Sequence, residues 1–360
     1  MTTIQQAFDP RRNSLNAIRL VLALLVIVSH TWPIGGYGRE LHLGDQTLGN
    51  WAVAGFFAIS GYLITGSRLH SRNFVDYLWR RVLRIYPAFF VVLVIVAFGF
   101  APLVAAATGD GPWTVSGAVQ YVVKNLALDI RQYGVPDTLN SVPLPRAWNG
   151  SLWTLFYEFL CYLAVGVAAS FLPRRALQWC AVAALVLGGG ATLVITHGLV
   201  SVPTTLELFI RLLAFFAGGM LLYLLADRVP LSGWLALAAL LALAVAAAVG
   251  VSRPLAGLPV AYLMLYLGSR LPLHRVGSRN DISYGVYIYA FPVQQVLVYL
   301  FADRAIDPLS FALLSAIGTV PLAWASWLFI EKPAMSLKRL TAGRNSTTAH
   351  ADVQSQPRKL

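Results

Sequence analysis

Ten apolar segments occupy most of this sequence and constrain what it can fold into. A helix of about 20 apolar residues spans the hydrocarbon core of a bilayer. The segments are residues 15–34, 48–66, 86–107, 150–171, 176–197, 204–226, 231–250, 254–269, 281–301 and 308–330. Hydrophobic residues make up 58% of the chain and charged residues 12%, and the mean hydropathy is +0.66. We therefore expect an all-α, polytopic membrane protein with about ten transmembrane helices.

The Lys and Arg residues are distributed unevenly between the two sides that these segments define. An even number of membrane helices places both termini on one side. Of the 27 Lys and Arg residues, 20 lie on that side, six lie on the other, and Arg211 lies within a segment. Because cytoplasmic loops retain positive charge, both termini are predicted to be cytoplasmic. The net charge of +12 therefore reflects membrane orientation and does not indicate nucleic-acid binding.

The domain organisation follows from the same segments. Residues 1–14 are predicted to form a cytoplasmic N-terminal segment, residues 15–335 the transmembrane domain, and the polar residues 336–360 a disordered cytoplasmic tail. Cys161 and Cys180 lie in or at the edge of apolar segments, so we expect neither a disulfide nor a metal site.

Arg19 and His30 are the first candidates for a functional site. Both lie in the apolar stretch LNAIRLVLALLVIVSHTWP, where a charged side chain costs a few kcal/mol unless it faces the protein interior. They are about three helical turns apart, so they lie on nearly the same helix face, about 16 Å apart along its axis. The alternative is that Arg19 reaches the lipid headgroups and His30 hydrogen-bonds to a neighbouring helix.

A basic stretch, RLHSRNFVDYLWRRVLRIYP, lies between the second and third apolar segments. Arg80, Arg81 and Arg84 are predicted to concentrate positive charge on a short helix that lies at the inner surface before Pro87. Guanidinium groups form bidentate hydrogen bonds to phosphate oxygens, so this cluster is a candidate phosphate site. Ordinary contact with lipid headgroups explains the pattern equally well.

Glu158, in the stretch SLWTLFYEFL, is the carboxylate that we expect beside His30. It lies about eight residues, or about 12 Å, inside the outer end of its segment, and His30 lies at a similar depth. A carboxylate that accepts a hydrogen bond from an imidazole fixes its tautomer and raises its basicity. Ser60, on the second segment, is more typical of a hydroxyl that bonds to its own helix than of a nucleophile.

Other polar residues receive structural interpretations. Glu207 and Arg211, spaced i, i+4, are expected to form an ion pair within the membrane. Asp281 is predicted to cap a helix, and the stretch FIEKP is predicted to end the last one. The loop from Gly35 to Gly49 is more typical of a solvated turn than of the lining of an entrance.

Taken together, these motifs resemble the acyltransferase-3 family of integral-membrane O-acyltransferases, which modify bacterial exopolysaccharides, lipopolysaccharides and related glycans. The resemblance covers residues from about 13 to 335. Arg19 and His30 match the family's arginine and histidine, and the other matching stretches are FFAISGYL, RRVLRIYP, SLWTLFYE, SYGVYIYAFP and FIEKP. Many members carry a histidine where this chain has Ala290. The stretches NGSLWTL and YIYAFPVQQ are most similar to the exopolysaccharide-acetylating branch.

The resemblance implies an enzyme that transfers an acyl group, most often acetyl, from cytoplasmic acyl-CoA. The implied acceptor is a hydroxyl of a cell-surface glycan, an exopolysaccharide or its lipid-linked oligosaccharide precursor. The implied location is the bacterial inner membrane, with several passes through the bilayer. No bound cofactor is expected, because acyl-CoA is a co-substrate.

The family's residue roles are carried over onto matching positions. His30 is expected to be the general base, helped by Glu158, with Arg19 as the third catalytic residue. Direct transfer is the simpler mechanism, and an acyl-enzyme intermediate on His30 or Ser60 is the alternative. The residues expected to bind acyl-CoA are Arg80, Arg81 and Arg84, and the candidates for lining the substrate site are Ser60, Ser151, Tyr157, Arg211 and Tyr287.

Two other functions fit the same residues. A transporter or flippase for a lipid-linked saccharide would use the intramembrane charges as a substrate path, without covalent chemistry. A membrane acyltransferase that acts on lipid or protein acceptors would differ from the glycan enzyme only in its acceptor.

Overall fold

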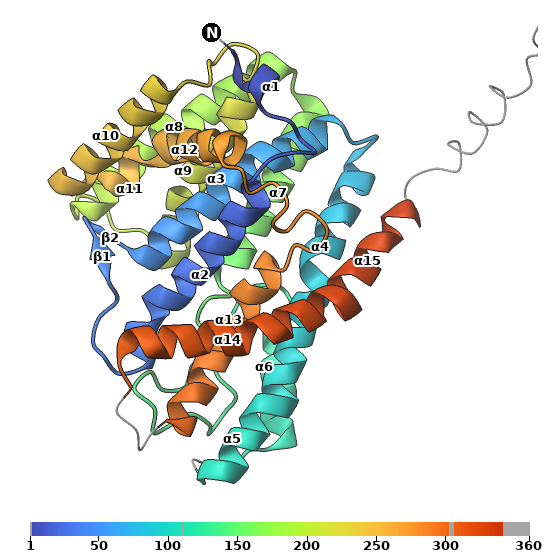
Figure 1. The fold of residues 1–360 in the computed structure, drawn as a ribbon, viewed down its shortest axis with the longest axis vertical. Coiled ribbons are helices and arrows are strands. Elements are labelled where there is room, and N and C mark those ends of the chain that lie inside the picture. Colours follow the sequence, from blue (N-terminus) through green and yellow to red (C-terminus); the bar gives the residue numbers. More distant parts are fainter. Residues whose placement is uncertain (1, 110, 302–305, 341–360) are drawn as a thin grey trace, which may run out of the picture.

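A computed structural model describes residues 2–109, 111–301 and 306–340, which fold into a bundle of helices (Figure 1). Each of the ten predicted apolar segments coincides with a helix, so the all-α class is confirmed. The longer helices are α2 (Leu15–Ile34), α3 (Leu48–Leu69), α4 (Phe74–Ile95), α5 (Ala101–Thr108), α6 (Val115–Asn125), α7 (Thr154–Phe171), α8 (Arg174–Thr196), α9 (Thr204–Leu224), α10 (Gly233–Val249), α12 (Gly257–Arg270), α13 (Ser283–Leu300) and α14 (Pro308–Ser326). The short helices are α1 (Ile4–Ala7), α11 (Ser252–Leu255) and α15 (Lys332–Ser336).

Seven helical segments among the described residues are long and apolar enough to cross a membrane. They are α2, α3, the continuous helix of α4 and α5, α7, α8, α9, and the continuous helix of α14 and α15. The other three predicted spans correspond to α10, to α11 with α12, and to α13. The chain is thus a polytopic membrane protein, whereas ten spans and cytoplasmic termini stay predictions.

The helix that begins with α4 does not stop at Pro87. It runs without interruption from Phe74 to Thr108, over 35 residues. A proline removes one backbone donor, but neighbouring groups in a membrane protein satisfy the freed carbonyl and the helix continues. The predicted short surface helix before Pro87 is therefore wrong, because Arg80, Arg81 and Arg84 lie on the spanning helix itself.

Two π-helical turns interrupt the regular geometry of the long helices. Val96–Phe100 joins α4 to α5, and the carbonyl of Ala97 in this turn accepts a hydrogen bond from Trp113 Nε1 at 2.8 Å. Trp327–Glu331 joins α14 to α15. Such turns re-aim side chains and occur often at functional sites.

The second π-turn contradicts the predicted helix end at FIEKP. Pro333 occupies the first turn of α15, where a missing N–H is tolerated, and the helix runs on to Leu340. Residues 337–340 form its final 3-10 turn. The remainder of the predicted tail, residues 341–360, lies outside the described residues.

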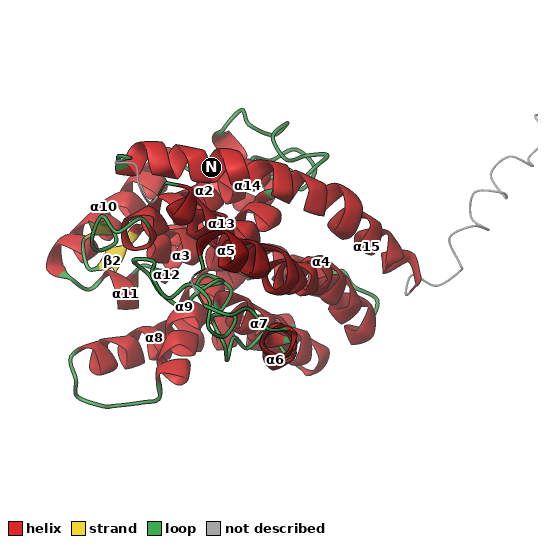
Figure 2. Cartoon of the chain, turned by 90° about the horizontal axis from the view of Figure 1, so that it is seen from below, coloured by secondary structure: helices red, strands yellow, loops and turns green. Residues whose placement is uncertain are grey.

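Helix α3 is central to the bundle, and α2, α7, α9 and α12 all pack against it. Seen from below, α14 and α15 lie along one side of the bundle and α8 lies at the opposite side (Figure 2). A Cβ on Gly61 of α3 would lie 1.9 Å from the carbonyl oxygen of Phe216, and one on Gly219 of α9 would lie 1.9 Å from that of Ala58. Only glycine permits this backbone contact, which is typical of membrane helix pairs.

The loop from Gly35 to Gly49 is not a simple solvated turn. It contains the hairpin of β1 (His42–Leu43) and β2 (Gln46–Thr47). Gln46 is buried and donates a hydrogen bond to Ser252 Oγ at 2.9 Å, and Ser252 in turn donates to the carboxylate of Asp45. These bonds fix the loop against α11, so the prediction of a solvated turn is wrong.

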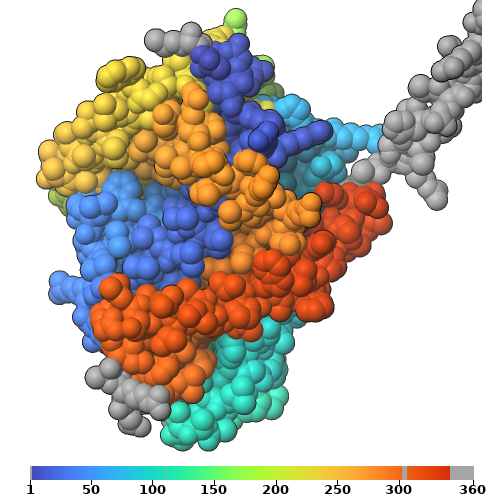
Figure 3. Space-filling model, in the orientation of Figure 1, coloured from blue at the N-terminus to red at the C-terminus, as the bar shows by residue number. Residues whose placement is uncertain are grey.

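The N-terminal segment is folded onto the bundle. The amides of Ile4 and Gln5 donate to the carbonyls of Val229 and Ala226, each at 2.9 Å, and Ile4 is fully buried. In the space-filling view this segment, in dark blue, lies over residues coloured yellow and orange (Figure 3). It therefore forms a strap across the connection between α9 and α10.

Candidate active site

The intramembrane charges gather in two places, and the first is an ion network that we call the charged cluster (Arg19, Arg84, Asp281 and Glu331). Asp281 Oδ2 accepts from Arg19 Nη1 at 3.1 Å and from Arg84 Nη2 at 2.6 Å. Arg84 Nη1 lies 3.0 Å from Glu331 Oε2. Two guanidinium groups thus face two carboxylates, and α2, α4 and α14 are tied to the start of α13.

Three members of the charged cluster have further contacts that suit a buried ion network. Glu331 is only 1% exposed, and it also accepts from Ser326 Oγ at 3.2 Å. The Arg84 guanidinium lies 5.5 Å from the ring centre of Trp327, a cation–π contact. Asp281 Oδ1 accepts from the amide of Ser283 at 3.2 Å, but Ile282 is the N-cap of α13, so Asp281 lies one residue before the predicted cap position.

The structure separates the three arginines that were expected to bind acyl-CoA. Arg84 uses both terminal nitrogens on Asp281 and Glu331. Arg80 pairs with Asp76 at 3.0 Å, one helical turn away. Arg81 donates to Ser67 Oγ at 3.4 Å, and its buried Nε has no partner among the described residues. Of the three arginines, Arg81 is the one with a buried N–H group, at Nε, that has no acceptor among the described residues.

Glu158 lies on α7 and holds two hydroxyls. Its Oε1 accepts from Ser60 Oγ of α3 and from Tyr162 Oη, each at 2.6 Å. The Ser60 proton therefore points at a carboxylate, not at its own helix as expected. This carboxylate can draw the proton from a hydroxyl that approaches it.

A small cavity of about 30 Å³ connects Arg19 with Glu158. That volume holds one water molecule or the end of an acyl chain. Tyr287 also lines the cavity, and its Oη lies 2.6 Å from Thr154 Oγ1 and donates to the carbonyl of Ser151 at 2.7 Å. The structure thus brings together Arg19, Glu158 and Tyr287, with Ser60 and Ser151 directly behind them.

Two predicted substrate-lining residues lie elsewhere. Tyr157 packs its ring against Trp153 and Phe209, with ring centres 5.7 and 6.5 Å away, and does not line this cavity. Arg211 lies near the start of α9 and also does not line it. Among the described residues Arg211 forms no ion pair with Glu207, because both side chains are half-buried in the first two turns of α9, where headgroups and water can solvate them.

The second group of charges surrounds His30. The carboxylate beside it is Glu40, whose Oε1 lies 3.9 Å from His30 Nε2, and both side chains are largely buried. Glu40 Oε2 accepts from Ser29 Oγ at 2.8 Å, and Ser29 Oγ accepts from the amide of Gly49 at 2.8 Å. The carboxylate is therefore held in place by α2 and by the start of α3.

The predicted pairing of His30 with Glu158 is wrong. Glu158 is occupied by Ser60 and Tyr162, whereas the hairpin loop brings Glu40 to the imidazole. The sequence does show that Glu40 lies in the loop directly after the helix that carries His30. It does not show that this loop folds back and brings Glu40 to the imidazole. We call His30 and Glu40 the histidine pair.

The imidazole of His30 is poised with one nitrogen unused. Its Nδ1 is buried and has no hydrogen-bond partner among the described residues. The ring meets the edge of Phe291 at 5.3 Å between ring centres. Phe291 lies one turn along α13 from Tyr287, so α13 links the histidine pair to the cavity that Glu158 lines. An imidazole with a carboxylate at one nitrogen and a free second nitrogen can act as a general base.

Comparisons with known proteins agree with this chemistry. A family model described as an acyltransferase domain matches residues 12–328. An O-acetyl transferase of Shigella phage Sf6 is 30% identical over 337 residues, which cover 89% of this chain and 96% of that protein. Nodulation protein 10 of Rhizobium leguminosarum bv. viciae is 29% identical over an alignment of 381 residues, which covers 94% of this chain and 97% of that protein. No solved structure matches the chain.

Proposed function

The chain belongs to the acyltransferase-3 family, and we propose that it transfers an acetyl group from cytoplasmic acyl-CoA to a sugar hydroxyl. The acceptor is a cell-surface glycan or exopolysaccharide, or its lipid-linked oligosaccharide precursor. A family of membrane acyltransferases and a relative named O-acetyl transferase support the reaction class and the acetyl group. The protein works in the bacterial inner membrane, where a lipid-linked acceptor and a cytoplasmic donor can meet.

The observation that carries this proposal is the histidine pair. Glu40 lies at 3.9 Å from His30 Nε2, and Nδ1 has no partner among the described residues. A carboxylate beside Nε2 favours the tautomer that keeps a hydrogen on Nε2, so Nδ1 carries the lone pair. It also stabilises the positive charge that the imidazole gains when it accepts a proton.

The transfer step follows from this arrangement. Nδ1 of His30 accepts the proton of the sugar hydroxyl while the hydroxyl oxygen attacks the thioester carbonyl. The carbon–sulfur bond then breaks, the acetyl group stays on the sugar as an ester, and the leaving CoA thiolate receives the proton from His30. A positioned general base contributes about 10²- to 10⁴-fold to such a rate.

Arg19, Glu158 and Ser60 have supporting roles in the same proposal. Arg19 lines the small cavity together with Glu158 and offers positive charge to the acyl-CoA donor on its way to His30. Glu158 orients the hydroxyl of Ser60, and direct transfer to the sugar requires no acyl-serine. Arg81, with its unused Nε, supplies a cation where the donor enters.

The test is transfer of radiolabel from acetyl-CoA to polysaccharide or its lipid-linked precursor in membranes. Wild type is compared with His30→Ala at equal protein level, and with His197→Ala as a matched control, because His197 is exposed at the end of α8. We expect label with wild type and His197→Ala, and at least a hundredfold loss with His30→Ala.

Two outcomes would overturn the proposal. If wild-type membranes label no acceptor over a range of acyl-CoA donors, a transporter or flippase for a lipid-linked saccharide becomes the better explanation. If His30→Ala labels as well as wild type, His30 is not the base. If label appears on lipid or protein instead of glycan, the protein is still an acyltransferase, but the proposed glycan acceptor is wrong.

A further inference from the structure

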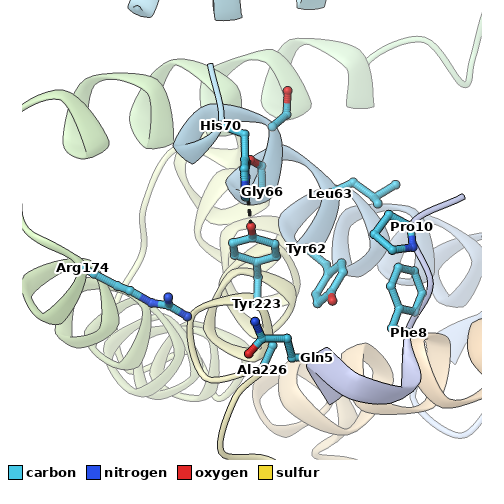
Figure 4. A pocket seen from close by; sticks show the side chains of 11 residues that line it. Gln5, Phe8, Pro10, Tyr62, Leu63, Gly66, His70, Arg174, Tyr223 and Ala226 are labelled. Carbon is cyan, nitrogen blue, oxygen red and sulfur yellow. Dashed lines mark hydrogen bonds between the residues drawn. The ribbon is translucent and has the colours of Figure 1, made fainter. Parts of the chain in front are cut away.

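The structure contains a large pocket that none of the residues assigned above explains. Its volume is about 590 Å³, within the range of pockets that hold cofactors and nucleotides. The residues that line it are Gln5, Phe8, Pro10, Tyr62, Leu63, Gly66, Ser67, His70, Arg174, Tyr223 and Ala226 (Figure 4). They come from the N-terminal strap, the end of α3, the start of α8 and the end of α9.

All of these elements end on the side that the Lys and Arg distribution predicts to be cytoplasmic. Arg174 is the first residue of α8, and His70 lies in the connection between α3 and α4. The exposed residues Arg11 and Arg12 directly follow Pro10 at the strap. The pocket therefore opens toward the compartment that holds acyl-CoA, with positive charge at its rim.

One wall of the pocket is aromatic. The rings of Phe8 and Tyr62 meet edge to face at 5.3 Å, and those of Tyr62 and Tyr223 at 5.2 Å. Gly66 permits this wall, because a Cβ there would lie 2.6 Å from the Tyr223 ring. Aromatic side chains bind nucleobases by stacking, with about 1–3 kcal/mol for each base.

The opposite side of the pocket carries a group for a phosphate. Arg174 reaches in from α8, where its guanidinium donates to the carbonyl of Leu224 at 2.9 Å and lies 3.6 Å from Asp227 (Figure 4). His70 lies beside the aromatic wall: its Nδ1 is 2.9 Å from the Gly66 carbonyl and 3.3 Å from Tyr223 Oη, which leaves Nε2 for a ligand (Figure 4). An aromatic wall that faces a guanidinium group fits a nucleotide better than an uncharged ligand.

The large pocket and the small cavity that Arg19 and Glu158 line are separate, and both are lined by residues of α3. Ser67 lines the large pocket and accepts from Arg81 Nη2, and Tyr62 lies two residues from Ser60, which binds Glu158. From Gly66 to Phe56, which lines the small cavity, α3 rises about 15 Å. An extended pantetheine arm spans such a distance, so a donor whose nucleotide lies in the pocket can place its thioester near Arg19 and Glu158.

We propose that this pocket binds the adenosine 3′-phosphate diphosphate portion of acyl-CoA, with Arg174 on a phosphate and the aromatic wall against the adenine. The assignment rests on the acyl-CoA donor of the proposed function. It replaces Arg84 and Arg80, which lie 2.6–3.0 Å from carboxylates, by Arg174, whose contact with Asp227 is longer, at 3.6 Å, and whose side chain is 54% exposed. The N-terminal strap then forms part of the donor site.

The experiment measures binding of CoA and of adenosine 3′,5′-bisphosphate to the purified full-length protein in nanodiscs by isothermal titration. Arg174→Gln removes the phosphate ligand, and Arg175→Gln is its matched control, since Arg175 is exposed on the next position of α8 and does not line the pocket. Leu63→Trp fills the pocket from a partly exposed position. Thermal unfolding checks that each variant is folded.

We expect about tenfold weaker binding of both probes with Arg174→Gln, unchanged binding with Arg175→Gln, and no binding of the bisphosphate with Leu63→Trp. If wild type binds CoA and both pocket variants bind it equally well, the pocket assignment is overturned and the proposed function survives. If wild type binds no CoA at all, the proposed function is contradicted, because acyl-CoA is then not the donor. If nanodiscs of anionic phospholipid abolish bisphosphate binding that neutral nanodiscs allow, the pocket is a headgroup site and the assignment is overturned.

Discussion

The charged cluster and the histidine pair both include a residue of α2, and they differ in how completely their charges are paired. In the charged cluster each guanidinium reaches a carboxylate at 2.6–3.1 Å. In the histidine pair the nitrogen and oxygen are 3.9 Å apart and Nδ1 is unused. Buried ion pairs hold helices together, because removal of either partner leaves an unpaired charge in a medium of low dielectric constant. A buried titratable group that lacks a hydrogen-bond partner is instead available to interact with a substrate. The difference in pairing is what we expect if the charged cluster stabilises the fold and the histidine pair carries out the proposed proton transfer.

The largest effect on stability is expected from Glu331→Gln, which keeps the side-chain shape and removes one charge of the cluster. Because Glu331 is 1% exposed, the change leaves Arg19 and Arg84 with Asp281 as their one carboxylate in the cluster, and this excess buried positive charge costs about 3–5 kcal/mol of unfolding free energy. Unfolding of the purified protein by denaturant measures this cost. Asp129→Asn, in the exposed pair with Arg131, is the control and should cost less than about 1 kcal/mol.

The opposite result would break the comparison. If Glu331→Gln unfolds like wild type but loses acetyl transfer, the charged cluster belongs to the reaction site and not only to the scaffold.

A smaller effect, on rate instead of stability, is expected from Glu40→Gln. The amide cannot stabilise the imidazolium of His30, so kcat should fall about 10- to 100-fold while KM for acetyl-CoA stays unchanged. Label transfer at several donor concentrations measures both, and Glu40→Asp should recover part of the rate. Asp45→Asn is the control in the same loop, because Asp45 contacts Ser252 and Arg253 and not His30. Wild-type kcat in Glu40→Gln would show that the carboxylate is dispensable.

The smallest effect is expected from Ser60→Ala, which removes one of the two hydrogen bonds to Glu158. A single hydrogen bond of this kind is worth about 1–3 kcal/mol, so transfer should fall by about tenfold and not vanish. Tyr162→Phe removes the other bond and should have a similar effect. Complete loss with Ser60→Ala alone, as measured by the same label transfer, would point to an acyl-serine and end the direct-transfer mechanism.

The sequence was informative where a local pattern decides the structure. Each apolar run predicted a helix, because burial of backbone polar groups in lipid leaves no other choice. The position of Arg19 and His30 on one apolar helix marked two residues that the structure places beside largely buried carboxylates, Asp281 and Glu40. Asp281, directly before an apolar run, lies at the start of α13, one residue before its N-cap.

Contacts between distant residues could not be predicted in this way. Arg19 and Asp281 are 262 residues apart in the chain, and nothing in either neighbourhood identifies the other as its partner. Glu40 depends on the path of an irregular hairpin loop. The helix of α4 continues through Pro87 within the packed bundle, so the local rule for proline failed there.

The contact of α3 and α9 through Gly61 and Gly219 has a consequence for motion. Two backbones in direct contact cannot slide or separate without losing that contact, so the two helices move as one rigid body. Tyr62 and Gly66 lie on one of these helices and Tyr223 on the other, and this wall of the large pocket is therefore preorganised. The N-terminal strap completes the pocket from another side, where the amides of Ile4 and Gln5 donate to the carbonyls of Val229 and Ala226.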